Sequence, residues 1–130
     1  MFIHIDPADG IPIYEQIVRQ IKFAAAGGVV RPGELIPSVR EVASELAVNP
    51  NTVAKAYRQL QIEGVVESVR GRGLQLSGES PEKCREERAR LVRLRFRDAI
   101  GEARRSRLGN DEIRELIEQE LSSITKEASA

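Results

Sequence analysis

Residues 46–66, LAVNPNTVAKAYRQLQIEGVV, contain the clearest signals for the fold of this chain. Asn49 is a favourable helix N-cap, because its side-chain oxygen can accept a hydrogen bond from a free helix amide, and Pro50 suits the first helical position. Gly64 ends the helix that these residues begin. Apolar residues recur on one face of that helix: Val53, Ala56, Tyr57 and Leu60. The polar cluster at its start is therefore either a plain cap or a surface that contacts a partner.

The residues upstream predict two more helices. The first begins after Pro12 and ends at Gly27-Gly28. We expect its core face to carry Tyr14, Ile17, Val18, Ile21, Ala24 and Ala25, and its solvent face to carry Glu15, Gln16, Arg19 and Lys22. The second begins at Ser38, which forms a capping box with Glu41. A brief turn through Ala47-Val48 joins this helix to the one already described.

Two short strands follow, at residues 65–69 and 74–76, with the sequence RGRG of residues 70–73 as the tip of their hairpin. With a short apolar piece at Leu35-Ile36, the order is helix, strand, helix, helix, strand, strand. Two helices joined by a tight turn and followed by a two-stranded ribbon make a winged helix-turn-helix. The fold class is therefore mainly α with a small β wing, and residues 1–77 form this domain.

The rest of the chain predicts a helical tail. The sequence SGESP of residues 77–81 is expected to be a linker. One helix covers roughly residues 82–107 and stops at Gly109, and another begins at Asn110 or Asp111. Each helix has one apolar stripe, and helices of this length cannot bury such a stripe alone. The tail therefore packs either on the first domain or on a second copy of the chain.

Composition limits the classes of function. The single cysteine, Cys84, excludes an internal disulfide, and with one histidine, His4, it leaves no set of zinc ligands. No apolar run approaches the roughly 20 residues of a membrane helix, and the first residues lack a signal peptide, so we expect a cytoplasmic protein. No nucleophile–base set or phosphate loop is present, so neither an enzyme nor a cofactor is expected.

The charge distribution is more informative than its sum. Net charge is zero, which argues mildly against nucleic acid as a partner. Residues 83–107, however, hold ten basic and four acidic side chains. This basic stretch is either a solvated helix face, a surface for DNA phosphates, or a charged surface between subunits.

The polar cluster matches what a helix-turn-helix requires, because its second helix enters the major groove N-terminus first. At about 100° per residue, Asn51, Lys55 and Arg58 lie opposite the core face, and Thr52 lies beside them. Asparagine can pair with adenine, threonine can meet a thymine methyl, and lysine can reach guanine or phosphate. Asn49 is equally well explained as a cap alone.

Three arginines outside this helix are further candidates for DNA contacts. Arg40, in the first turn of the preceding helix, suits a phosphate, or else pairs with a neighbouring glutamate. Arg70 and Arg72 frame Gly71 at the wing tip, where they can enter the minor groove or hold phosphate. An ordinary hairpin turn would need the glycines but not both arginines. Tyr14 and Tyr57 face inward by periodicity and are expected in the core.

These residues resemble the GntR family of bacterial transcriptional regulators. The similarity lies in PIYEQIVRQI, residues 12–21, and in RPGELIPSVREVASELAVNPNTVAKAYRQLQIEGVVESVRGRGLQL, residues 31–76. The features most specific to the family are the following residues at their spacing along the chain: Pro32-Gly33, Ile36-Pro37-Ser38-Val39-Arg40, Asn51-Thr52-Val53, Leu60 and Glu63-Gly64. The short tail resembles the YtrA subfamily. Too few residues follow the wing for the larger effector-binding or aminotransferase-like domains of other subfamilies.

The resemblance implies a cytoplasmic, nucleoid-associated homodimer that binds a pseudo-palindromic operator, and we expect a repressor. It implies that Arg40 contacts the DNA backbone, that Asn49, Asn51, Thr52 and Lys55 face the groove, and that Gly71 and its neighbours form the wing. It makes residues 78–130 a dimerisation tail, whose interface we expect at Val92, Phe96, Ile100, Leu116, Ile117 and Leu121. Many relatives have serine or arginine where this chain has Pro50, which removes one contact.

Two questions stay open at this point. An unidentified small-molecule effector is compatible with the family, but no residue of the sequence points to one. The alternative function is a winged-helix module for protein–protein interaction, which the balanced charge of residues 1–78, with eight basic and eight acidic side chains, would suit. The polar face of Asn51 and Lys55 counts against that alternative, because an interface core favours aromatic anchors.

Overall fold

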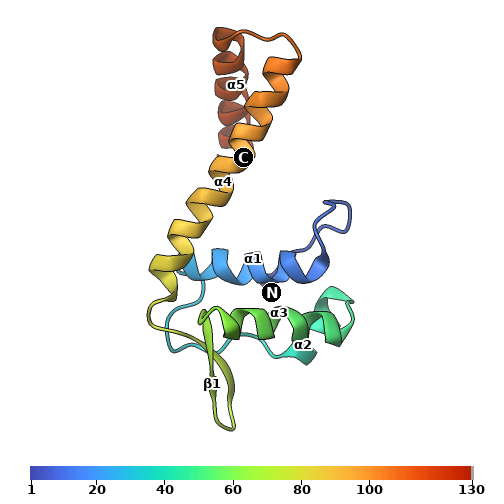
Figure 1. Ribbon diagram of the computed structural model, residues 1–130, viewed down its shortest axis with the longest axis vertical. Helices are drawn as coiled ribbons and strands as arrows, with labels where there is room; N and C mark the ends of the chain where they lie inside the picture. Colours follow the sequence, from blue (N-terminus) through green and yellow to red (C-terminus); the bar gives the residue numbers. More distant parts are fainter. Residues whose placement is uncertain (130) are drawn as a thin grey trace. The chain divides into compact units, whose positions relative to one another are not determined.

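The computed structural model describes residues 1–129. The chain divides into two compact units, Met1–Ala89 and Arg90–Ala130. The elements in chain order are α1 (Ile13–Ala26), α2 (Val39–Leu46), α3 (Pro50–Ile62), β1 (Val66–Val69), β2 (Gly73–Leu76), α4 (Ser80–Arg105) and α5 (Asn110–Ser129). The mainly helical fold with a small β wing is therefore confirmed (Figure 1).

The core of the first unit lies where α3 packs against both α1 and α2. Its fully buried side chains include Ile17 and Ile21 of α1, Val42 of α2, and Val53 and Leu60 of α3. The positions in α1 and α3 are among the apolar positions that the helical spacing predicts. Their burial leaves the opposite face of α3 in solvent, so the core determines which side chains this helix presents.

Both ends of α2 are capped, the first by a side chain and the second by the backbone. Ser38 Oγ accepts a hydrogen bond from the Glu41 amide at 3.1 Å, as a capping residue should. At the other end of α2, Ala47 adopts a left-handed conformation (φ 53°), and the Val48 amide donates to the Ala43 carbonyl. This is the hydrogen-bond pattern of a Schellman ending, in which glycine is more usual.

The wing is an antiparallel hairpin in which Val66 pairs with Leu76 and Val69 with Gly73. The short apolar piece before α2 meets this hairpin through a single bridge, Leu35 to Gln75, rather than as a full strand. Gly71 at the tip has a φ of 75°, which favours glycine over other residues. Figure 1 shows the hairpin projecting from the helical body.

Two residues expected on the solvent face of α1 are buried instead, so that prediction was wrong for them. The Gln16 side chain donates to the carbonyls of Asp6 and Ile11 and accepts from the Asp6 amide, which ties the N-terminal segment to α1. Lys22 is buried between carboxylates of α3 and α4. Helical periodicity assigned both to solvent because it does not show which other segments cover a helix.

The expected linker at residues 77–81 is also different in the structure, because α4 already begins at Ser80. Ser77 Oγ donates to the Gly64 carbonyl and Ser80 Oγ to the Val65 carbonyl, each at 2.6 Å. Cys84, one turn further along, belongs to the hydrophobic core. The beginning of α4 is therefore part of the first unit.

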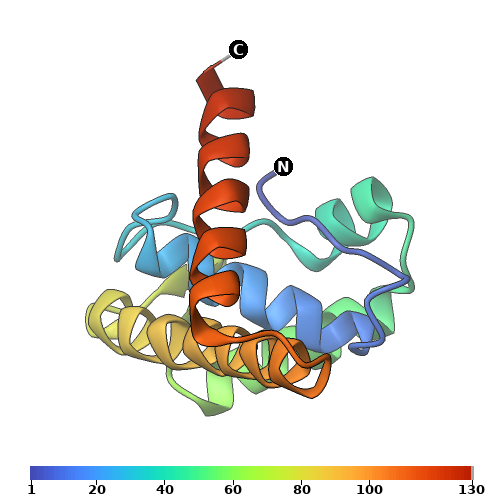
Figure 2. The same cartoon turned by 90° about the horizontal axis from the view of Figure 1, so that it is seen from above.

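The second unit contains the end of α4 and the whole of α5. The expected stop at Gly109 is replaced by an earlier one: α4 ends at Arg105, and Arg107 adopts the left-handed conformation with φ 71°. The Leu108 amide donates to the Ala103 carbonyl and completes the ending. Figure 2 shows that α5 then turns away from α4 rather than lying along it.

Candidate nucleic-acid interface

The outer face of α3 presents the polar residues that the sequence singles out. Asn51, Lys55 and Arg58 are exposed and Thr52 is half-buried, while the apolar residues between them enter the core. Tyr57 is buried as expected and donates its hydroxyl hydrogen to the Pro37 carbonyl at 2.6 Å. This bond ties α3 to the segment before α2, so the helix is held against the body while its polar face stays free.

Asn49 acts as a cap. Its Oδ1 accepts a hydrogen bond from the Asn51 amide at 2.8 Å, and Pro50 occupies the first turn of α3. One lone pair of the acceptor oxygen is therefore engaged in the cap, and the amide hydrogens of Asn49 can still be donated to another partner.

Lys55 has a neighbour that the sequence does not reveal. Its Nζ lies 3.9 Å from the centroid of the Tyr14 ring, which is the geometry of a cation–π contact. Tyr14 is half-buried rather than fully in the core, so its expected role is only partly right. Periodicity places Tyr14 near the apolar stripe of α1, but no pattern along the chain shows that the face of its ring meets Lys55 of α3.

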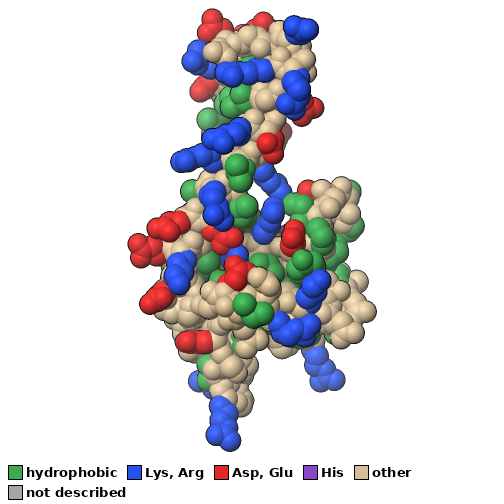
Figure 3. All heavy atoms as spheres, viewed as in Figure 1, with side chains coloured by type: hydrophobic (Ala, Val, Ile, Leu, Met, Phe, Trp, Pro, Cys, Tyr) green, Lys and Arg blue, Asp and Glu red, His purple; other side chains and the backbone are tan. Residues whose placement is uncertain are grey.

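A groove of about 650 Å³ separates α3 from the wing. Arg58 lines it from the helix, and Arg70 and Arg72 line it from the hairpin, so three cations surround one hollow. Gln61 and Ser68, exposed polar residues that the sequence does not single out, also line it. Figure 3 shows basic side chains at the tip of the wing. A negatively charged strand of nucleic acid matches this lining.

Arg40 lies in the first turn of α2 with its side chain in solvent. Within the described residues, no ion pair joins it to Glu41 or Glu45, the neighbours that a purely structural role would use. Its guanidinium is available beside the free amides at the start of α2, where a phosphate is favoured.

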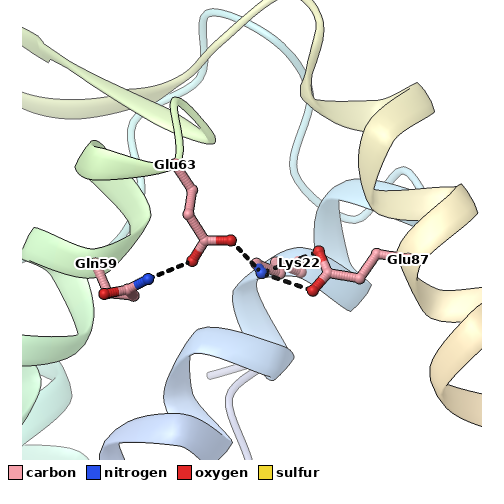
Figure 4. Close-up of polar contacts among 4 residues, drawn as sticks. All are labelled: Lys22, Gln59, Glu63 and Glu87. Atoms are coloured by element: carbon pink, nitrogen blue, oxygen red, sulfur yellow. Dashed lines mark hydrogen bonds and ion pairs between the residues drawn. The ribbon is translucent and has the colours of Figure 1, made fainter.

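The far end of α3 is held by an ionic cluster around the buried Lys22 (Figure 4). Lys22 Nζ lies 2.8 Å from Glu63 and 2.9 Å from Glu87, and Gln59 donates to the second oxygen of Glu63. Burial by itself would lower the pKa of Lys22, but the hydrogen bonds and charges of both glutamates outweigh it, so the pKa is raised. Burial likewise opposes ionisation of Glu63, yet Lys22 and Gln59 lower its pKa. Lys22 and Glu63 therefore stabilise each other in their charged forms.

The expected interface residues of the tail are largely uncovered. Ile100 is half-buried, and the others are exposed: Val92, Phe96, Leu116, Ile117 and Leu121. Leu94 and Ile124 are also exposed, and the sequence does not single them out as interface residues. Their apolar character is the signal that could have added them.

Other kinds of site find no support in the part of the chain that the structure describes. Among residues 1–129, no cluster of histidine, cysteine and acidic side chains is placed to hold a metal ion. Over the same range, no helix combines the length and the apolar character needed to cross a membrane.

Comparison with known proteins agrees with this geometry. Residues 13–76 match the family described as bacterial regulatory proteins, gntR family. The chain is 37% identical over 124 residues to the HTH-type transcriptional repressor YtrA of Bacillus subtilis (strain 168), covering 95% of each protein.

Solved structures are also similar to the chain. A GntR family transcriptional regulator from Listeria monocytogenes matches with a TM-score of 0.70 and 30% identity, over 88% of this chain and 98% of that one. AraR(DBD) in complex with operator ORE1 matches with a TM-score of 0.50 and 26% identity, over 57% of this chain and 90% of that one. The chain belongs to the GntR family of bacterial regulatory proteins.

Proposed function

We propose that this GntR-family regulator represses transcription by binding a pseudo-palindromic operator as a homodimer. The observation that carries the proposal is the exposed polar face of α3 beside a groove lined by Arg58, Arg70 and Arg72. In a winged helix-turn-helix, this face enters the major groove and the wing lies along the backbone. The repressor named YtrA, similar over nearly its whole length, supports the direction of regulation.

The residues have separate roles in this proposal. Asn51 and Thr52 read base edges, and Lys55, held on the Tyr14 ring, reaches a guanine or a phosphate. Arg40 and the wing hold phosphates on either side of the groove, with Gly71 allowing close approach of the wing backbone. Asn49 sets the start and direction of α3 and adds a contact to DNA through its amide hydrogens.

The tail joins two copies so that their α3 helices meet successive turns of the DNA. Its exposed apolar residues, from Val92 to Leu121, form a surface that favours burial against another chain. As a DNA-binding regulator, the protein would act in the cytoplasm at the nucleoid, without a cofactor and without enzymatic activity. None of these residues is assigned to a small-molecule effector.

The test is the binding of the full chain to its own promoter DNA, measured against salt. If Arg40, Arg70 and Arg72 of two copies each neutralise a phosphate, the log–log slope should be about −5, at roughly 0.9 per contact. A flat plot would contradict DNA binding and favour a module for protein–protein interaction. Moving one half-site by about 5 base pairs, half a turn of DNA, should abolish binding of the dimer. Unchanged affinity after that shift would contradict the dimeric arrangement.

A further inference from the structure

A second hollow of the first unit, of about 620 Å³, adjoins the groove between α3 and the wing. The two share part of their lining, namely Val39, Tyr57 and residues 72–74. The rest of the second hollow is lined mainly by the segment between α1 and α2, together with Phe2 near the N-terminus. Its volume is typical of sites that bind small molecules. We call this hollow the wing-root pocket.

Hydrogen bonds within the chain hold the walls of the wing-root pocket in place. The Ile36 amide donates to the Leu74 carbonyl at 2.9 Å, which fastens the segment before α2 to the wing. The Tyr57 hydroxyl fastens the same segment to α3 through the Pro37 carbonyl. The pocket is therefore preformed, as binding sites for small molecules usually are.

The lining of the wing-root pocket is largely apolar, and part of it is open to solvent. Leu35 is 43% exposed, although its backbone forms a bridge to Gln75 of the wing. Phe2, Val39 and Leu74 also line the pocket and are half-buried. Because covering such surface removes apolar area from water, the pocket favours a ligand with an apolar body.

Two carboxylates make the wing-root pocket acidic. Glu34 and Glu41 both line it and are exposed, whereas Arg72 is the single basic residue of the lining. Burial raises the pKa of Tyr57, and the negative charge of Glu41 adds to that rise, so the Glu41 carboxylate lies near the buried hydroxyl. Within residues 1–129, neither carboxylate forms an ion pair with a basic side chain. The pocket therefore attracts a cation more strongly than an anion.

We propose that the wing-root pocket binds a small amphiphilic amine, a molecule that carries one ammonium group on an apolar body. The apolar body lies against Leu35, Val39 and Leu74. The ammonium group pairs with the Glu41 carboxylate, and Glu34 adds to the attraction. An anion of the same shape would leave both carboxylates uncompensated and would bind more weakly.

The position of the pocket makes this amine a regulator of DNA binding, and this part of the inference rests on the proposed function. Glu41 lies in the first turn of α2 and directly follows Arg40, the residue proposed to hold a phosphate. The charge of Glu41 repels that phosphate, and a bound ammonium group neutralises it. The amine should therefore act as a corepressor, which strengthens operator binding by the dimer about two- to fivefold. Operator DNA should strengthen amine binding in return.

The first measurement is a titration of the full chain without DNA, followed by the amide signals in NMR spectra. Three probes share a phenyl group at the end of a short alkyl chain: phenylbutylamine, phenylbutanol and phenylbutyrate. The amine should shift the signals of residues 34–41 and 72–74 and saturate with a Kd on the order of 1 mM, as expected for a ligand of this size. The alcohol should bind at least about twofold more weakly than the amine, and the acid at least about fivefold more weakly.

Two results of this titration would overturn the proposal. One is an acid that binds as tightly as the amine, because the carboxylates would then have no effect on the choice of ligand. The other is the lack of a saturable shift at amine concentrations about tenfold above the expected Kd.

Variants separate the contribution of charge from that of shape. Glu34→Gln/Glu41→Gln should bind the alcohol normally but lose the preference for the amine, because the apolar walls remain. Leu35→Gln should weaken all three probes, since it removes exposed apolar lining outside the core. The matched control, Glu45→Gln/Glu86→Gln, removes two exposed carboxylates that do not line the pocket and should bind like the original chain. A Glu34→Gln/Glu41→Gln chain that still prefers the amine would overturn the role of these carboxylates.

The regulatory part is tested by operator binding with phenylbutylamine, compared with an equal concentration of sodium chloride. The amine should raise the operator affinity of the original chain about two- to fivefold and leave that of Glu34→Gln/Glu41→Gln unchanged. Unchanged or lower affinity of the original chain would overturn the role as a corepressor. A chain that binds the amine but no DNA would contradict the proposed function and support the pocket, whereas DNA binding without amine binding would overturn only the pocket.

Discussion

Replacing Lys22 by methionine should lower the free energy of unfolding of the first unit by about 2–3 kcal/mol. Lys22 is only 5% exposed and is the sole cation between Glu63 and Glu87 within the described structure. Removing one partner of a buried pair typically costs about 3–5 kcal/mol. The two carboxylates are about one-third exposed, so water partly solvates them and we expect a cost at or just below the lower end of that range. For a chain of this size, such a loss corresponds to a melting temperature lower by about 10 °C.

The dependence on pH distinguishes the ionic cluster from simple packing. The pKa of Glu63 is lowered in the folded chain. Its contribution to the free energy of unfolding is therefore present above its usual pKa and is lost as pH falls through its pKa in the folded chain. The pKa of Lys22 is raised, so its contribution is present below its usual pKa and is lost only as pH rises through the folded value. The difference in free energy of unfolding between the original chain and Lys22→Met should therefore be largest near pH 7 and shrink in acid.

The assay is urea unfolding followed by circular dichroism, at one protein concentration, near pH 7 and near pH 3.5. A second variant, Lys22→Met/Glu63→Gln/Glu87→Gln, removes the unpaired charges and should recover stability to within about 1 kcal/mol of the original chain. A Lys22→Met chain as stable as the original at pH 7 would refute the reasoning. A deficit that stays the same in acid would show that lost packing, not charge, is the cause.

Three further predictions concern the turn, the reading helix and the wing. Ala47→Gly should stabilise the chain by about 0.5–1 kcal/mol in urea unfolding. A left-handed residue with a Cβ costs about 1–2 kcal/mol, and the larger entropy that glycine loses on folding offsets part of the gain. A variant less stable than the original would contradict this. Tyr14→Leu should weaken operator binding about 2–5-fold by removing the ring that holds Lys55, whereas Tyr14→Phe should bind normally; equal effects of both changes would show that the ring is irrelevant. Arg70→Ala/Arg72→Ala should make the slope of log affinity against log salt concentration shallower by about 2–4 for a dimer, while preserving the preference for operator over random DNA. An unchanged slope would show that the wing does not contact the DNA backbone.

The helices and the wing are predictable because their signals are local. Asn49, Pro50 and the apolar spacing of α3 act within one helix, and the Ser38 cap acts within one turn, so the sequence contains the whole cause. The exposed position of Asn51 follows directly, since the buried face of α3 determines the opposite face.

Contacts between distant segments are not predictable in the same way. Lys22 lies on the polar side of α1, and only the folded structure brings Glu63 and Glu87 to it from positions far along the chain. The Tyr14 ring beneath Lys55 is another contact of this kind. The sequence SGESP looks like a linker because it is small and polar, yet its two serines donate to the carbonyls of Gly64 and Val65, between α3 and the wing.

The most direct test of DNA reading by α3 compares two variants on two DNAs, the operator and a random sequence of equal length. Asn51→Ala should lose operator affinity by about 1–3 kcal/mol while its affinity for random DNA stays nearly constant, because asparagine reads a base edge. Lys55→Ala should weaken binding to both DNAs if its main contact is a phosphate, and provides the matched comparison. The account predicts that Asn51→Ala lowers the ratio of operator to random-sequence affinity at least about fivefold. An unchanged ratio, with both affinities reduced equally, would contradict the assignment of Asn51 to sequence recognition.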